Sequence, residues 1–333
     1  MKFGVFCTYE NPDADFARAY SAQSKLIRRA EALGFDEAWV AEHHFDPDAA
    51  SPSIFPLIGY LAGVTSRIRL GSAAALLAFR NPIQVAEDVA TVDVLSGGRF
   101  DFGVAKGGPF ALQNKHFDVE EKDSRAMTVE ALELIDRLLN EETVSFQGNY
   151  YACDHVSIAP RPLQSPVPTY VATATPDAVA YAARRGFGIM GGSPFPIERI
   201  VQAVEAYREA GGPEADPRLI LARFYFAART RDKALAQAVP FIHRFSERMQ
   251  GIFLARGEKG PVFDPSGLIE RSLIGSFDEV RDKIAFLQER TGFRSVILKP
   301  ASLDEDRNLG ALDDFAEHIR PFVTQAPERQ AAL

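Results

Sequence analysis

The chain has 333 residues, of which 46% are hydrophobic and 25% are charged, and its formal net charge is −8. This composition is typical of a folded protein and excludes long disordered regions. The negative charge argues against a nucleic-acid surface and against binding to an anionic membrane, because each requires a basic patch. Cys7 and Cys153 are the only cysteines, so we expect no disulfide framework, no cysteine-based zinc site and a cytoplasmic location.

Short apolar runs alternate with helical patterns along the first half of the chain. The run at 2–7 predicts a strand, and apolar residues at helical spacing from Phe16 to Leu33 predict a helix that Gly34 ends. The next expected elements, in chain order, are a strand at 37–41, a helix at 54–65, a strand at 68–76, a helix at 82–95, a strand at 99–104 and a helix at 124–140. Pro82 suits the first turn of its helix, where the missing N–H has no partner to lose.

The second half of the chain continues the same alternation. Its expected elements, in chain order, are a strand at 170–172, a helix at 176–185, a strand at 188–191, a helix at 196–210, a strand at 219–227, helices at 232–249 and 277–290, a strand at 295–298 and a helix at 304–322. Strands that alternate with helices predict a parallel sheet covered by helices. Eight such units favour an α/β fold, a closed (β/α)8 TIM barrel, with functional residues at the C-terminal ends of the strands.

Three segments are longer than a minimal barrel needs, namely 106–123, 143–168 and 251–276. Long ordered loops are often functional lids. Because 251–276 combines glycine, proline and charged residues, we expect it to form a mobile lid or insertion. We therefore expect a single barrel domain over 1–323, followed by a polar C-terminal tail at 324–333.

The triplet Glu42-His43-His44 directly follows the second expected strand. In one interpretation Glu42 pairs with an arginine and the histidines are ordinary loop residues. In a second, the histidines bind a metal, although other strand ends would then have to supply ligands, and only His116 lies in a suitable loop. In a third, one histidine performs acid/base chemistry near neutral pH. These three interpretations stay open on the residues alone.

Basic and hydroxyl side chains at other strand ends indicate a phosphate site. Lys106 follows the fourth strand, where it could neutralise an anion. Arg125 lies in the first turn of its helix, where the helix dipole disfavours a cation unless an anion is bound. Thr175 and Pro176 begin the helix after the fifth strand, so free N–H groups and the hydroxyls of Thr173 and Thr175 form a phosphate cradle. A solvated lysine and a plain helix cap would need no ligand and also fit the pattern.

One stretch matches the residue pattern of a dinucleotide-binding motif but not its structural context. The stretch GFGIMG at 186–191 spells G-x-G-x-x-G, but it follows a helix and leads into a strand. A dinucleotide-binding motif requires the reverse order, a strand followed by a helix. We therefore reject this interpretation.

Five motifs in the same order as in a known family extend over most of the chain. They are WVAEHHF at 39–45, RIRLGSAAALL at 67–77, NPIQVAEDVATVDVLSGGRFDFGVAKG at 81–107, DSRA at 123–126 and YVATATPDAVAYAARRG at 170–186. Together they resemble the bacterial luciferase-like flavin-dependent monooxygenase family. Such proteins are (β/α)8 barrels, so the resemblance implies the same fold as the strand–helix alternation.

The resemblance implies a reaction with reduced FMN and O2. A separate flavin reductase would supply the reduced FMN as a transient partner, and a C4a-hydroperoxyflavin would oxygenate a small organic substrate. Phenylalanines near expected strand ends suggest an apolar substrate such as an aldehyde or ketone; they are Phe6, Phe45, Phe79, Phe110 and Phe195. The resemblance also implies a homodimer.

Individual residues take roles from the same resemblance. His43 corresponds to the catalytic histidine, His44 to its neighbour, and Glu42 to a residue under the flavin. Ala73 and Ala74 correspond to a non-proline cis peptide bond beneath the flavin ring. The other cofactor-binding residues that we expect are Ala105, Lys106, Arg125, Val171, Ala172, Thr173, Ala174, Thr175, Gly192 and Ser193.

Two positions depart from the luciferase pattern and leave the function open. Ala105 stands in place of a reactive cysteine, which argues against light emission, and Thr173 replaces a carboxylate of the catalytic luciferase subunit. A hydride-transfer oxidoreductase dependent on the deazaflavin F420 shares the barrel and needs no oxygen. A non-catalytic flavin-binding subunit and a metal hydrolase also stay open as functions of this chain.

Overall fold

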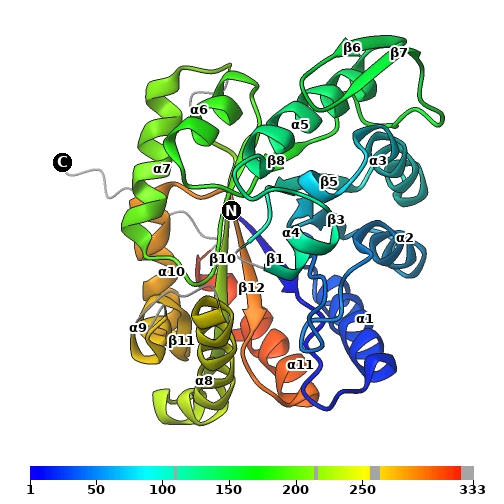
Figure 1. Ribbon diagram of the computed structural model, residues 1–333. Helices are drawn as coiled ribbons and strands as arrows, with labels where there is room; N and C mark the ends of the chain where they lie inside the picture. Colours follow the sequence, from blue (N-terminus) through cyan, green and yellow to red (C-terminus); the bar gives the residue numbers. More distant parts are fainter. Residues whose placement is uncertain (109–110, 214–216, 256–262, 324–333) are drawn as a thin grey trace.

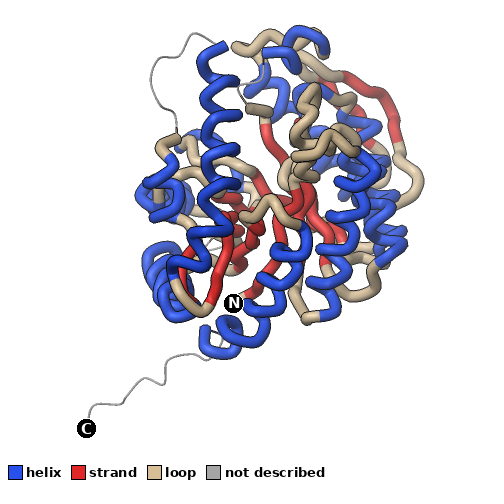
Figure 2. The backbone as a smooth tube through the Cα atoms, turned by 90° about the horizontal axis from the view of Figure 1, so that it is seen from below, coloured by secondary structure: helices blue, strands red, loops and turns tan. Residues whose placement is uncertain are grey.

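The computed structural model describes residues 1–108, 111–213, 217–255 and 263–323. Parallel strands close into a barrel with helices around its outside (Figure 1, Figure 2). Around the barrel the strands are β1 (Lys2–Cys7), β2 (Glu37–Val40), β3 (Arg69–Ser72), β5 (Phe100–Ala105), β8 (Thr169–Val171), β9 (Gly188–Gly191), β10 (Leu219–Ala228) and β12 (Ser295–Pro300). Because β12 pairs with β1, the sheet is closed and the predicted (β/α)8 barrel is confirmed.

The helices follow the strands as the apolar periodicity predicted. The helices between strands are α1 (Phe16–Ala32), α2 (Ile54–Val64), α3 (Pro82–Ser96), α5 (Ser124–Asn140), α6 (Pro176–Arg184), α7 (Ile197–Ala210), α8 (Arg231–Ala255), α10 (Phe277–Thr291) and α11 (Glu305–Asp314). A π-helical turn, Phe315–Ile319, connects α11 to the short α12 (Arg320–Val323). The expected helix at 304–322 is therefore three consecutive segments.

Local sequence signals explain where several helices begin and end. The Asn81 side chain accepts a hydrogen bond from the Ile83 N–H at 2.9 Å, and Pro82 occupies the first turn of α3. Gly97 ends α3 with a φ of 67°, a left-handed conformation that glycine adopts without a steric penalty. Ser276 and Glu279 form a capping box at the start of α10.

A small apolar cluster fills the inside of the barrel. Trp39, Tyr170, Met190, Ile220, Ala222 and Ile297 form this cluster. The ring of Trp39 lies where a Cβ atom on Gly71 would stand, so the indole requires glycine on the neighbouring strand. The interior of the barrel is therefore packed by side chains below the C-terminal strand ends.

The long segments contain regular structure that the sequence patterns did not predict. An antiparallel hairpin of β6 (Val144–Gln147) and β7 (Ala152–Val156) lies beyond α5 (Figure 1). Other additions are the helices α4 (Ala111–His116) and α9 (Pro265–Arg271), and the strand β11 (Leu273–Ser276), which pairs with the C-terminal half of β10. The expected lid at 251–276 thus contains the end of α8, α9 and β11, while its residues 256–262 and the tail at 324–333 lie outside the described residues.

The third expected strand is not continuous. Its residues 68–76 divide into β3 and β4 (Ala75–Leu76), separated by a cis peptide bond between Ala73 and Ala74. A 3-10 turn, Leu77–Phe79, follows. The strand pattern concealed this break, because alanine and leucine suit a strand and a bend equally well, but the family resemblance predicted the cis bond and this prediction is confirmed.

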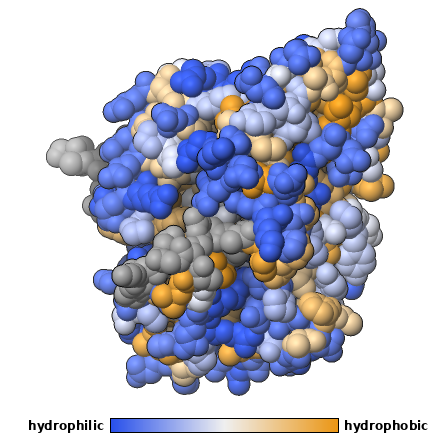
Figure 3. All heavy atoms as spheres, in the orientation of Figure 1, coloured by the Kyte–Doolittle hydropathy of each residue, from blue (hydrophilic) through white to orange (hydrophobic). Residues whose placement is uncertain are grey.

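The face of the molecule seen in Figure 3 is largely hydrophilic, with scattered hydrophobic patches. Within the described part of the chain, no helix is long and apolar enough to cross a membrane.

Candidate active site

A cavity of about 280 Å³ opens at the C-terminal ends of β5, β8 and β9. It brings together most of the cofactor-binding residues expected from the sequence. These are Ala105, Lys106, Arg125, Val171, Ala172, Thr173, Ala174, Thr175 and Gly192. They come from four separate segments of the chain, and the closed barrel places those segments side by side.

One end of this cavity has the chemistry of an anion site. Arg125 on α5 donates a hydrogen bond from Nη1 to the Thr175 hydroxyl at 2.8 Å. The Thr175 hydroxyl lies 3.1 Å from that of Thr173. Thr175 is the N-cap residue of α6, as predicted, but its side chain makes no capping hydrogen bond. The free N–H groups at the start of α6 therefore remain available to a bound anion.

The charges in the cavity wall are all of one sign. Lys106, Arg125 and Arg199 line it, and its described lining includes no carboxylate. Arg199 on α7 stacks over the ring of Phe195 at 4.4 Å from the centroid. Three cations without acidic partners in this lining favour a dianionic group such as a phosphate monoester.

The wall of the cavity between these polar groups is apolar. Val129 and Leu132 of α5 and Met190 of β9 contribute to it. An apolar wall next to an anion site fits a molecule with a flat aromatic ring and a phosphate. The residues present therefore fit FMN.

The remaining expected site residues lie elsewhere. Ser193 is buried, its hydroxyl has no partner among the described residues, and it does not line the cavity. Glu42, His43 and His44 follow β2, and Ala73 and Ala74 follow β3. Ala73 and Ala74 therefore stand at the end of the strand next to β5, and the other three residues stand one strand further along the barrel.

Glu42 is a buried carboxylate with several partners. It pairs with Arg80, which donates from Nη2 at 2.9 Å and from Nε at 3.2 Å. It lies 2.7 Å from Nε2 of His44 and accepts the N–H of Leu76 at 3.2 Å. The pairing of Glu42 with an arginine, one of the sequence-based interpretations, is therefore present. These contacts also tie the loop after β2 to the segment that follows the cis peptide bond.

The two histidines have different surroundings. The ring of His44 is held by Glu42 and packs edge-on against Phe117, with centroids 4.9 Å apart. His43 is half-buried, and burial together with the charges of Arg248 and Lys299 lowers its pKa to about 3. The imidazole of His43 is therefore neutral at pH 7, and its low pKa makes it a weak base there. Within the described residues, no group of three His, Cys, Asp or Glu side chains is placed to hold a metal ion.

The sequence patterns missed a set of charged residues near His43. Glu10 follows β1 and pairs with Lys299 of β12 at 2.7 Å. On α8, Arg248 pairs with Asp46, and Arg244 pairs with Asp48 at 2.5 Å. Glu10 and Lys299 stand at predicted strand ends, which was a usable signal. The arginines of α8 gave no such signal, because a helix surface rich in arginine is ordinary.

Aromatic side chains flank the barrel mouth. Phe79 and Phe45 both pack against Phe117, with centroids 5.4 and 5.5 Å away. Phe195 lines the cofactor cavity, whereas Phe110 lies outside the described residues. Phe6 packs against the apolar cluster inside the barrel.

The model of the luciferase-like monooxygenase family matches residues 1–295. The chain belongs to this family. The family resemblance that the motifs indicated is therefore confirmed, and membership supports an oxidoreductase.

Two relatives that match along most of the chain are monooxygenases. The solved structure of the monooxygenase RslO1 from Streptomyces bottropensis superposes with a TM-score of 0.87 and 26% identity, covering 96% of this chain and 99% of that one. Limonene 1,2-monooxygenase from Rhodococcus erythropolis is 27% identical over 88% of this chain and 78% of its own.

Other relatives differ in their cofactor. The oxygenating constituent of 3,6-diketocamphane monooxygenase from Pseudomonas putida was solved in complex with FMN. It has a TM-score of 0.77 and 19% identity, and the match covers 98% of this chain and 99% of that one. The F420-dependent glucose-6-phosphate dehydrogenase of Kineococcus radiotolerans is 34% identical, but the match spans only 55% of this chain and 57% of that one. Family relatives thus include proteins with FMN and with F420.

Proposed function

We propose that this protein is a monooxygenase that uses reduced FMN and O2 to oxygenate a small apolar organic molecule such as an aldehyde or ketone. The observation that carries the proposal is the cavity at the ends of β5, β8 and β9. It joins Lys106, Arg125 and the hydroxyls of Thr173 and Thr175 to an apolar wall, with no carboxylate in its described lining. Reduced FMN, when bound there, supplies the electrons that activate O2.

Separate residues would hold the two ends of FMN. Arg125, Lys106 and the N-terminus of α6 would bind the phosphate, while Val129 and Met190 would contact the ring. Ala105, Ala172 and Ala174 keep the wall free of large side chains, and Gly192 lies beside them. Glu42 and the Ala73–Ala74 peptide lie at neighbouring strand ends, where the family resemblance places the underside of the ring.

His43 would handle protons in this reaction. Its imidazole is neutral at pH 7 and a weak base, so it would take a proton from a reacting group only briefly and return it later in the cycle. His44 is held by Glu42 and Phe117, so we assign it a supporting role for the loop that carries His43. General acid/base catalysis of this kind contributes ~10²–10⁴-fold to a rate.

F420-dependent hydride transfer is the second candidate, and Arg199 is the observation that favours it. The side chain of F420 bears more acidic groups than that of FMN, and Arg199 adds a third cation to the cavity. The two cofactors are distinguished by titrating the protein with each in turn. Tighter binding of F420 than of FMN would replace the first proposal with the second.

The partners of the reaction follow from the same proposal. We expect a separate flavin reductase to deliver reduced FMN, and we expect a homodimer in solution, which sedimentation velocity measures directly. Both cysteines are free thiols, Cys7 within the core and Cys153 in β7, which suits a reducing cytoplasm.

The decisive experiment is an anaerobic titration with photoreduced FMN, followed by mixing with O2 in a rapid-scan spectrometer. We expect a transient species that differs from both reduced and oxidised FMN and outlives the oxidation of free reduced FMN. His43→Ala should shorten or abolish it, while His155→Ala, at an exposed site on β7, should leave it unchanged. FMN binding without a transient species would indicate a non-catalytic flavin-binding subunit.

A further inference from the structure

A buried ion pair stands at the barrel mouth on the side away from the cofactor cavity. Nζ of Lys299 lies 2.7 Å from Oε1 of Glu10, and the Thr8 hydroxyl donates to the same oxygen at 2.8 Å. Lys299 is buried, with 5% of its surface exposed. The proposed binding of FMN uses neither residue, so the pair requires its own explanation.

The surroundings of Lys299 make the pair mutually dependent. The rings of Phe224, Phe241 and Phe245 surround its ammonium group, with centroids 5.4 to 5.5 Å from Nζ. Aromatic faces attract a cation but replace little of its lost hydration, so a buried ammonium needs an anion. Glu10 is that anion. Burial alone would raise the pKa of Glu10, but Lys299 holds it below its usual value.

Backbone contacts join Glu10 to the loop that carries His43. Glu10 forms an antiparallel bridge with Ala49, and the N–H of Ala50 donates to the Tyr9 carbonyl at 3.0 Å. Within the same loop, the N–H of His43 donates to the Ser51 carbonyl at 3.2 Å. The loop after β1 and the loop after β2 therefore form one connected unit, and a displacement of Glu10 would be transmitted to His43.

His43 also interacts electrostatically with both members of the pair. Lys299 and Arg248 disfavour a proton on the imidazole, His44 acts in the same sense, and Glu10 opposes them. The charge of Arg248 is itself paired with Asp46. Lys299 is thus a buried cation whose charge acts on His43, and Glu10 is the carboxylate that partly offsets it.

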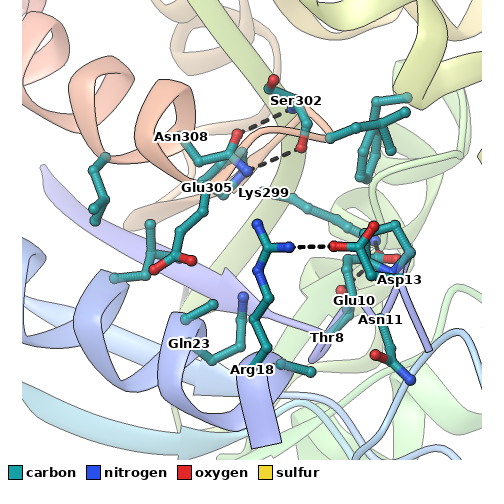
Figure 4. A pocket seen from close by; sticks show the side chains of 18 of the residues that line it. Thr8, Glu10, Asn11, Asp13, Arg18, Gln23, Lys299, Ser302, Glu305 and Asn308 are labelled. Carbon is teal, nitrogen blue, oxygen red and sulfur yellow. Dashed lines mark hydrogen bonds and ion pairs between the residues drawn. The ribbon is translucent and has the colours of Figure 1, made fainter. Parts of the chain in front are cut away.

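Both members of the pair line a second cavity, of about 80 Å³ (Figure 4). In this view Lys299 lies between Glu10, in the loop after β1, and Asn308 of α11. The Asn308 side chain accepts the N–H of Ser302 at 3.0 Å. Both polar and apolar side chains line this cavity, and Glu10 and Lys299 are among them. None of its lining residues belongs to the cofactor cavity.

We propose that Glu10 and Lys299 are positioning residues for His43: the pair holds the loop that carries His43 in place and sets the charge that acts on its imidazole. The proposal rests on the proposed role of His43 in the monooxygenase reaction. Neither residue touches the reacting atoms. Lys299 disfavours a proton on His43 and Glu10 favours one, so the pair sets how readily the imidazole accepts a proton.

The proposal predicts opposite effects for the two charges. Lys299→Met removes a cation and leaves the negative charge of Glu10, so the pKa of His43 should rise from about 3. Glu10→Gln leaves the cations without their anion, so His43 should stay neutral to a lower pH. In Glu10→Gln/Lys299→Met the effects should nearly cancel, and this variant buries no unpaired charge, which protects the fold.

The test is a pH titration of the protein without FMN, labelled with ¹³C at the histidine rings and followed by NMR. His43→Gln assigns the signal. Lys25→Met is the matched control, because it removes a lysine from an exposed pair with Glu305 at the rim of the same cavity. We expect the His43 midpoint to rise in Lys299→Met and to stay unchanged in Lys25→Met. An unchanged midpoint in Lys299→Met, or equal shifts in both variants, would overturn the proposal.

A second readout separates this proposal from the monooxygenase reaction itself. Rapid mixing with reduced FMN and O2 follows the pH dependence of the transient species in wild type and in Lys299→Met. A shifted His43 midpoint with no transient species in either protein would leave the electrostatic role standing and refute the proposed reaction. A transient species with an unshifted His43 midpoint would support the proposed reaction and refute the electrostatic role.

Discussion

Removal of the Arg125 guanidinium tests the anion site directly. Arg125 is exposed on α5 and contacts Thr175 at 2.8 Å, so Arg125→Gln should leave the fold intact. If the cavity binds the phosphate of FMN, the variant loses one charge-assisted hydrogen bond to a phosphate oxygen. Such a bond contributes about 1.5–3 kcal/mol.

This energy translates into a measurable change in affinity. At 1.4 kcal/mol for each factor of ten, the dissociation constant for FMN should rise ~10–100-fold in Arg125→Gln. Riboflavin has the same ring and lacks the phosphate, so its dissociation constant should not change. Quenching of flavin fluorescence measures both constants in one titration series.

The control substitution lies on the same helix as Arg125. Arg137, also on α5, pairs with Glu141 at 2.8 Å and does not line the cavity, so Arg137→Gln should bind FMN like the wild type. Equal loss of affinity for FMN and riboflavin in Arg125→Gln would show that Arg125 supports the cavity rather than the phosphate. Unchanged affinity for FMN would refute the assignment of the phosphate to this end of the cavity.

Three further predictions concern stability. Glu42→Gln should lower the free energy of unfolding by about 3 kcal/mol in urea titrations, because it breaks the buried pair with Arg80; a loss under ~1 kcal/mol would contradict this role. Gly71→Ala should cost about 1–3 kcal/mol, since the ring of Trp39 occupies the space of the new methyl group, whereas Gly63→Ala, with open space around it, should cost nothing by the same measurement. His43 has a lower pKa in the folded protein than in the unfolded chain, so below pH ~6.5 the unfolded chain binds more protons than the folded protein. Through this residue the free energy of unfolding should fall by about 2 kcal/mol between pH 7 and pH 5. His43→Gln should remove that part of the pH dependence, and an identical pH dependence in wild type and variant would refute it.

The fold was predictable from the sequence because its signals are local. Apolar periodicity, Pro82 at a helix start and Gly34 at a helix end act within a few residues, and each is found in its expected place. The order of eight strand–helix units then restricts the topology to a barrel. The hairpin of β6 and β7 and the strand β11 escaped detection, since they are short and carry mixed polar and apolar residues.

For the candidate active site, too, some features follow from the sequence and others from the tertiary structure. The sequence by itself determined which residues stand at the strand ends, among them Lys106, Arg125 and Thr175, and the family motifs attached an expected flavin to them. Only the tertiary structure decided which of these residues meet. It placed Arg125 against Thr175, 50 positions away, and Lys299 against Glu10 at the opposite end of the chain.

The physical reason is that charge pairing depends on distance in space, not on distance along the chain. A lysine in a strand pattern resembles any surface lysine until the closure of the barrel removes it from water. Once β12 lies beside β1 and three aromatic rings surround Lys299, Glu10 becomes the anion that makes its burial possible. The charge environment of His43 is therefore a property of the closed barrel.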